Sequence, residues 1–198
     1  MMQIFEIIIL ILSAVAHEYM HGWVAFSLGD PTSKNAGRLT LNPLAHLEWF
    51  GSVILPLFMV VTGMPFVFGW AKPVPYNPFN LRDKRWGDAK VAAAGPLTNF
   101  FIAIVFGLFL RLVPGLNAVF ANFVMAIVYI NLILGVFNLI PLPPLDGSKI
   151  LASFFPYRAR EAYMNVGRMG FLLVIIVVLF VGELIIPLVN LLFKLIVG

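Results

Sequence analysis

The chain contains no cysteine among its 198 residues. Disulfide bonds are therefore excluded, and any metal site must use histidine, aspartate or glutamate as ligands. Charge is also scarce, because 11% of the residues are charged against about 25% in soluble domains. Hydrophobic residues make up 61% of the chain, and the mean hydropathy is +0.98. This composition predicts an integral membrane protein.

The net charge of +4 is modest, and its basic residues lie in loops beside apolar segments. That placement indicates membrane orientation and gives no sign of nucleic-acid binding. The first 28 residues are charged near their middle and show no cleavage site typical of a signal peptide. No soluble domain is appended in the sequence, so we expect a single membrane-embedded domain over residues 1–198.

Five apolar stretches are separated by polar loops: about 4–28, 50–66, 91–112, 119–140 and 169–194. A transmembrane helix needs about 20 apolar residues, so all but the second predict spanning helices. The second is short, and the prolines at 73, 75 and 78 prevent the following segment from being helical. We therefore predict an all-α polytopic membrane protein with four full spanning helices and a re-entrant helix/extended hairpin at about 50–78.

The distribution of lysine and arginine supports the hairpin. If all five stretches cross the membrane, these residues divide nine to four between the two sides, and a hairpin at 50–78 makes the division eleven to two. The positive-inside rule favours the second topology. It places the amino terminus outside the cytoplasm, and the ends of the first and fourth stretches on the cytoplasmic side.

The first apolar stretch contains the pentad His17-Glu18-Tyr19-Met20-His21, an H-E-x-x-H motif. In a helix, residues four apart share one face, so both imidazoles can bind one metal ion. The glutamate is then placed to act as general base on a metal-activated water. Ionisable residues at membrane depth are costly, which makes this trio a candidate for function over helix packing.

A catalytic zinc usually takes three protein ligands, and Asp146 is the best candidate for the third. It follows the fourth stretch, where three prolines end the helix, and the hairpin topology returns it to the side of the two histidines. His46, the only other histidine, is a possible accessory ligand or gate. Asn138 and Asn99 are amides in apolar helices that either bind the substrate backbone or join helices. Gly95-Pro96 is expected at a helix start, where proline is favoured.

At these residues the chain resembles the site-2 protease family of intramembrane zinc metalloproteases (M50-type), in its compact branch without PDZ or CBS domains. His17–His21 matches the family's first motif, and the stretch Asn138–Gly147 matches N-x-x-P-x-x-P-x-D-G, whose aspartate is the third zinc ligand. Ala94–Asn99 matches a G-P-x-x-N motif, and Gly69–Pro75 is similar to a stretch of the compact branch. His46 is followed by Leu47-Glu48-Trp49, where that branch commonly has Asp-Pro.

The resemblance implies a multi-pass cell-membrane protein that binds one Zn²⁺ per chain through His17, His21 and Asp146. It implies regulated intramembrane proteolysis, in which Glu18 is the catalytic base and the partner is a transmembrane protein substrate in the lipid bilayer. It also places Asn138 near the substrate. Regulatory substrates such as membrane-tethered transcription regulators or anti-sigma factors are typical of the family, and no residue here selects among them or indicates an oligomeric state.

Two other functions compete with a protease. A non-catalytic scaffold or metal-binding protein on the same fold would retain zinc without turnover, and the presence of Glu18 argues against it. A metal transporter would need further histidines or acidic residues tracing a path through several helices. The other apolar stretches supply almost none.

Overall fold

The computed structural model describes residues 2–63, 71–169 and 182–198. None of these residues lies in a β-strand, so the predicted all-α class is confirmed for the described ranges. The long helices are α1 (Met2–Ser27), α5 (Gly87–Leu112), α6 (Ala118–Asn138) and α10 (Gly182–Val197). The shorter elements are α2 (Thr32–Asn35), α3 (Pro43–His46), η1 (Trp49–Ile54), α4 (Leu55–Val61), η2 (Pro78–Asn80), α7 (Asp146–Ala152), α8 (Tyr157–Asn165) and η3 (Val166–Met169).

Among the described residues, three helices, α1, α5 and α6, are long and apolar enough to cross a membrane. Only 22% of the apolar window of α1, and 33% of those of α5 and α6, is buried inside the protein. Apolar helices that stay this exposed need lipid around them. The predicted fourth span is not settled, because α10 has 16 residues and much of the stretch 169–194 lies outside the described residues.

Helices α5, α6 and α10 pack around a small apolar core. Its buried members come from three helices: Ala103 of α5, Val128, Leu132 and Val136 of α6, and Ile185 and Val189 of α10. The expected helix start at Gly95-Pro96 is wrong, because α5 begins at Gly87 and Pro96 lies inside it. A membrane helix tolerates an internal proline where neighbouring helices and hydroxyl side chains satisfy the freed backbone groups. Close to this proline, Thr98 Oγ1 donates to the carbonyl oxygen of Ala94 at 2.8 Å, one turn earlier in the same helix.

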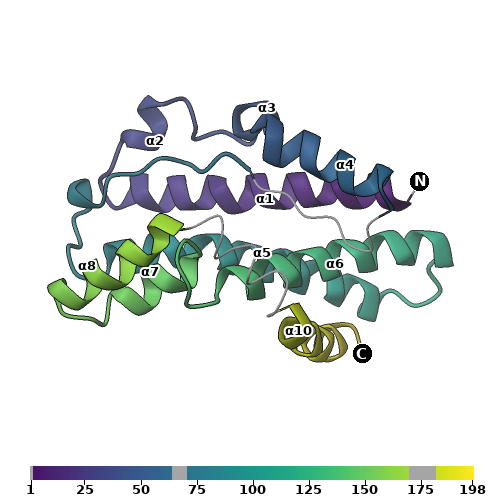
Figure 1. Cartoon of the computed structure of the whole chain (residues 1–198). Coiled ribbons are helices and arrows are strands. Elements are labelled where there is room, and N and C mark those ends of the chain that lie inside the picture. The colour runs from purple at the N-terminus through teal and green to yellow at the C-terminus, as the bar shows by residue number, and fades with distance from the viewer. Residues whose placement is uncertain (1, 64–70, 170–181) are drawn as a thin grey trace.

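The segment predicted as a hairpin contains the helical pair η1 and α4, followed by extended backbone at 71–77 that runs beside α1 (Figure 1). Residues 64–70, with the expected turn and Gly69-Trp70, lie outside the described residues. The extended part is held at both ends. Lys72 N donates to His46 O at 2.8 Å, and Asn77 N donates to the Asp30 carboxylate at 2.6 Å. Whether the pair is re-entrant stays a prediction.

Asp30 is the main anchor for the end of this extended segment. Its side chain is fully buried and accepts hydrogen bonds from Thr32, Asn77 and Asn80. Burial by itself raises the pKa of Asp30, but the donated hydrogen bonds outweigh it and hold the pKa below its ordinary value. An ionised carboxylate therefore ties residues 77–80 to the end of α1.

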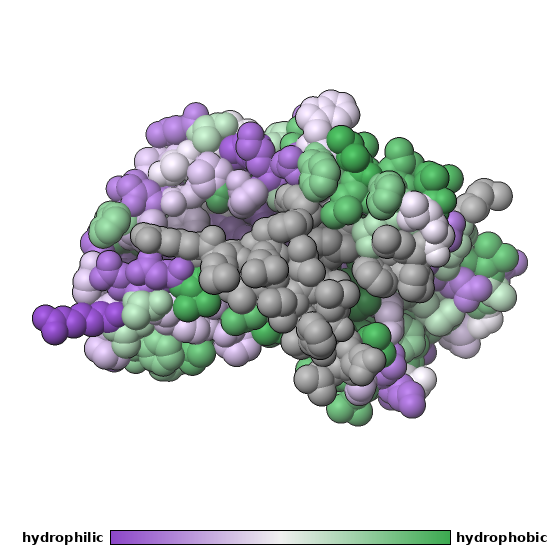
Figure 2. Space-filling model, viewed as in Figure 1, coloured by the Kyte–Doolittle hydropathy of each residue, from purple (hydrophilic) through white to green (hydrophobic). Residues whose placement is uncertain are grey.

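The connectivity brings the ends of distant helices together. Figure 1 shows that α1 ends, α5 begins and α6 ends at the same end of the molecule, where α7 and α8 also lie. Figure 2 shows hydrophilic side chains gathered at this end and hydrophobic ones around α4. The first and fourth apolar stretches therefore end close together, and this arrangement places α7 against the H-E-x-x-H segment. Which side of the membrane they face stays a prediction.

Candidate metal centre

The two histidines of the pentad share one buried face of α1. His17 is 6% exposed and His21 is 7% exposed, and their rings meet edge to face with centroids 4.6 Å apart. Their Nε2 atoms are 2.9 Å apart. The i, i+4 spacing therefore produces the convergence that the sequence predicts.

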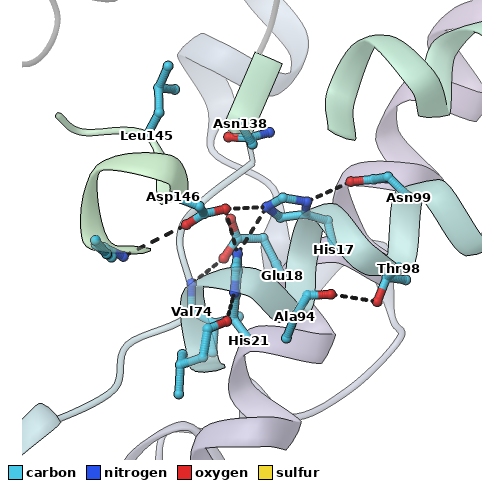
Figure 3. Close-up of polar contacts among 12 residues, drawn as sticks. His17, Glu18, His21, Val74, Ala94, Thr98, Asn99, Asn138, Leu145 and Asp146 are labelled. Atoms are coloured by element: carbon cyan, nitrogen blue, oxygen red, sulfur yellow. Dashed lines mark hydrogen bonds and ion pairs between the residues drawn. The ribbon is translucent and has the colours of Figure 1, made fainter. Parts of the chain in front are cut away.

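Asp146 approaches the two histidine Nε2 atoms from a different helix (Figure 3). It is the first residue of α7, and its Oδ2 lies 3.0 Å from His17 Nε2 and 3.1 Å from His21 Nε2. The glycine that follows allows this approach. A Cβ on Gly147 would lie 2.1 Å from the carbonyl oxygen of Leu139, so only glycine lets α7 begin directly against the end of α6.

The hydrogen-bond partners of the two Nδ1 atoms indicate which nitrogen of each imidazole ring carries a proton. His17 Nδ1 is 2.7 Å from Asn99 Oδ1, and His21 Nδ1 is 2.7 Å from the carbonyl oxygen of Val91. Both oxygens only accept hydrogen bonds, so each Nδ1 carries the proton. The amide of Asn99 is oriented by its Nδ2, which contacts Asn131 Oδ1 at 3.0 Å and Ser13 O at 3.5 Å. In the neutral imidazoles, which are the form that binds metals, both Nε2 atoms are therefore lone-pair donors.

Three atoms with lone pairs, one carboxylate oxygen and two imidazole nitrogens, thus converge on one point. A carboxylate oxygen and two unprotonated imidazole nitrogens at 2.9–3.1 Å repel one another unless a cation lies among them. Ligand atoms at zinc's usual bond lengths in tetrahedral geometry lie roughly 3.3 Å apart. These three residues also form the one His/Asp/Glu group within 4.8 Å among the described residues. Nitrogen and carboxylate donors in this number suit zinc.

A chain of buried amides holds the His17 ring in place. Asn99 and Asn131 are both fully buried, and Asn131 Nδ2 continues the chain to Ser13 Oγ at 2.9 Å. Of the two roles considered for Asn99, substrate contact and helix joining, its contacts match the second, and they add a bond to a ligand histidine. Such partners orient metal-binding imidazoles and fix their tautomer. Asn131 also joins helices, because its side chain contacts Asn99 of α5 and Ser13 of α1.

Gly95 leaves the space that the imidazoles occupy. A Cβ at this position would lie 2.4 Å from His17 Nε2 and 2.5 Å from His21 Nε2. The glycine of the G-P-x-x-N motif therefore lies at the metal-binding face of α5, directly behind both ligand nitrogens. The sequence alone does not suggest this role, because a glycine in an apolar helix is more often a packing residue.

Glu18 lies beside the two histidines and faces the extended segment. Its Oε2 accepts a hydrogen bond of 2.8 Å from the backbone N–H of Val74. The segment approaches α1 closely at Gly22, where a Cβ would meet Val74 Cγ1 at 2.9 Å. Because residues 73 and 75 are prolines, Val74 carries the only N–H in this stretch of three. The carboxylate is therefore oriented by one backbone donor.

A cavity of about 140 Å³ opens beside the convergence point. It is lined by the pentad residues His17, Glu18 and His21, by Pro73, Val74 and Tyr76, and by Asn138, Pro144, Leu145, Asp146 and Lys149. Burial and the Asp88 carboxylate raise the pKa of Tyr76 above its ordinary value, so its hydroxyl stays protonated and donates to Asp88. The volume holds several water molecules, and polar groups from four parts of the chain face it.

The remaining candidates lie in different surroundings. Asn138 lines the cavity, and its Nδ2 donates to Leu134 O at 3.0 Å, so a substrate role for it stays a prediction. His46 is 1% exposed, and its Nε2 lies 2.7 Å from Thr40 O. It is not part of the group of three metal donors. An accessory role for His46 therefore stays a prediction that no described contact with those donors supports.

Comparison with known proteins agrees with this geometry. A family model described as Peptidase family M50 matches residues 114–182, a range that contains Asn138 and Asp146. "Putative zinc metalloprotease YwhC" of Bacillus subtilis is 37% identical over 187 residues, which cover 90% of this chain and 80% of YwhC. The chain belongs to peptidase family M50. The sequence-based assignment to the site-2 protease family is thereby confirmed.

More distant relatives carry the same class of name. "Putative zinc metalloprotease Rip2" of Mycolicibacterium smegmatis is 28% identical over 85% of this chain, which spans 64% of Rip2. "Putative zinc metalloprotease MJ0611" of Methanocaldococcus jannaschii is 29% identical over 74% of this chain and 72% of its own length. No solved structure matches the chain. Family membership and the three apolar helices make this M50 chain a membrane metalloprotease, and zinc is its metal.

Proposed function

We propose that this chain is an intramembrane endopeptidase, which cleaves a peptide bond within or near the transmembrane segment of another membrane protein. His17, His21 and Asp146 would hold one zinc ion. The observation that carries the proposal is the convergence of two imidazole nitrogens and a carboxylate oxygen at 2.9–3.1 Å beside a second carboxylate, Glu18. All of these groups project from or against apolar helices of spanning length.

The metal and the protein side chains would have different roles in the reaction. Zinc bound here would polarise the scissile carbonyl and lower the pKa of water. Glu18 takes the proton of the attacking water and returns it to the leaving amine. Asn99 and the Val91 carbonyl keep the histidine lone pairs aimed at one point, and the amide of Val74 keeps the Glu18 carboxylate turned toward the cavity.

The orientation that we propose places the polar end of the molecule, with α2, α7 and α8, on the cytoplasmic side. The site then lies about one helix turn or two from the cytoplasmic end of α1, because His21 precedes its last residue, Ser27, by six positions. Substrates would be membrane-tethered proteins whose transmembrane helix unwinds near that surface. The family resemblance favours regulatory proteins.

The decisive experiment pairs metal analysis with cleavage. The purified chain is expected to hold one zinc and to cut tagged single-span test proteins that carry Gly or Pro near the middle of the span. His17→Ala and Asp146→Ala should each lose zinc and cleavage together, because two ligands do not make a catalytic site. Chelation should stop the wild type, and added zinc should restore it. A chain that keeps cutting after its zinc is removed would contradict the proposal.

The extended segment offers a second test, aimed at Glu18. Val74→Pro removes the one N–H donor to the carboxylate from a segment that is already extended between prolines. We expect kcat to fall on the order of 10²-fold with zinc retained, because a misplaced base loses the reactive geometry. Val74→Ala keeps the N–H and is the matched control. Equal rates for the two variants would show that this amide does not position the base.

A further inference from the structure

A lysine at the edge of the cavity is not used by the mechanism above. Lys149 lies one helical turn after Asp146 on α7 and lines the same cavity. Its side chain is 28% exposed, so the ammonium is neither free in solvent nor sealed in the protein. Among the described residues that line the cavity, it is the only lysine or arginine.

The position of the ammonium is determined by an aromatic ring. Lys149 Nζ lies 5.2 Å from the centre of the Tyr76 ring, within the range of a cation–π contact. The Tyr76 hydroxyl donates to Asp88, and the same carboxylate accepts from Arg160. The extended segment, α5 and α8 are thus tied together behind Lys149. A long flexible side chain is held over the site where it would otherwise extend into solvent.

The N–H donors of the Lys149 ammonium are not used by other residues in the described ranges. Nζ is 3.9 Å from Asp146 Oδ1, which is close enough for an ion pair and too long for a hydrogen bond. Asp146 uses its other oxygen, Oδ2, toward the histidines. Nζ forms no hydrogen bond with any residue in the described ranges. A lysine ammonium has three N–H donors, and here they border the space where a substrate carbonyl would lie.

We propose that Lys149 is a catalytic residue that stabilises the negative charge developing on the scissile carbonyl oxygen. This inference rests on the proposed function. As the oxygen of water bonds to the carbonyl carbon, Glu18 takes a proton and the carbonyl π electrons move to oxygen, where the ammonium donates a hydrogen bond. When the C–N bond breaks, its electron pair goes to nitrogen, which receives the proton from Glu18. The products are a carboxylic acid and an amine, and transfer of the acid's proton to the amine leaves a carboxylate and an ammonium.

A cation is better suited to this task than the neighbouring amide. Asn138 also lines the cavity, but its Nδ2 already donates to Leu134 O. Hydrogen bonds from an ionised donor to a charged oxygen are about twice as strong as neutral ones. The transition state carries more charge on oxygen than the substrate does, so Lys149 favours the transition state over the bound peptide.

Kinetics of Lys149→Met test the proposal, with the tagged single-span proteins described above as substrate. Methionine keeps an unbranched side chain and removes the charge. We expect kcat to fall about 10²-fold, as for loss of one oxyanion donor, with KM changed by less than about threefold and zinc content unchanged. Lys149→Arg should recover at least part of kcat. Lys90→Met is the control, since Lys90 pairs with Asp83 in another part of the surface.

The outcomes separate this inference from the proposed function. If the wild type cleaves and Lys149→Met has an unchanged kcat, the inference is wrong while the protease stands. A rise in KM alone, or loss of zinc, would also overturn it, because those results indicate ground-state binding or metal retention. If the wild type with its zinc cleaves none of the test proteins, the failure lies with the proposed function.

Discussion

Glu18→Gln is expected to abolish peptide hydrolysis while leaving zinc in place. The substitution keeps the size of the side chain and an oxygen that can accept from the Val74 amide. It removes the basic oxygen pair that accepts a proton from water. General-base catalysis contributes about 10²–10⁴-fold to the reaction rate, so the cleavage rate should fall by a factor of at least about 10². None of the three converging donor atoms belongs to Glu18, and zinc content should stay at the wild-type level.

Two controls make this result specific. Glu6→Gln changes a carboxylate on the same helix three turns away, outside the cavity, and should leave cleavage unchanged. Zinc content and the thermal unfolding midpoint are measured on all three proteins in the same detergent. Cleavage by Glu18→Gln within about tenfold of the wild type would remove the proposed base, since the expected loss is larger.

Gly95→Ala should cause loss of zinc although it changes none of the three ligand residues. The added Cβ would lie 2.4–2.5 Å from both ligand Nε2 atoms, a distance at which atoms cannot remain. The obstacle is the pair of imidazole rings, and their outer nitrogens are held by Asn99 and Val91, so they cannot retreat along α1. We expect zinc to be lost at concentrations that saturate the wild type, and cleavage to be lost with it.

Gly107→Ala is the matched control for crowding in the same helix. Its Cβ would meet a methyl group of Ile196 at 2.3 Å, so both substitutions crowd a buried face of α5. The Ile196 side chain is apolar and far from any metal donor, so this variant should lose stability and keep its zinc. Zinc retained by Gly95→Ala at wild-type affinity would show that the imidazoles have room that the structure does not indicate.

Much of the site could be predicted from sequence because its chemistry is local. The H-E-x-x-H spacing aligns His17 and His21 on one face of any helix, and the absence of cysteine narrows the other ligands to few residues. Asp146 was selected by the side of the membrane on which its helix ends, and its contact with both histidines agrees. Gly95-Pro96 was misjudged, because proline's preference for helix starts is weaker where packing helices support the backbone.

The sequence by itself determined a cysteine-free membrane protein, the two imidazoles and carboxylates available to a metal, and the family to which the motifs belong. Tertiary structure alone decided which nitrogen of each histidine is protonated, why position 95 has no side chain, which backbone amide orients Glu18, and that Lys149 faces the cavity. These features depend on backbone atoms and on contacts between residues 56 to 82 positions apart. A residue pattern records side-chain identity along the chain, and it carries no record of which carbonyl or amide a distant segment will meet.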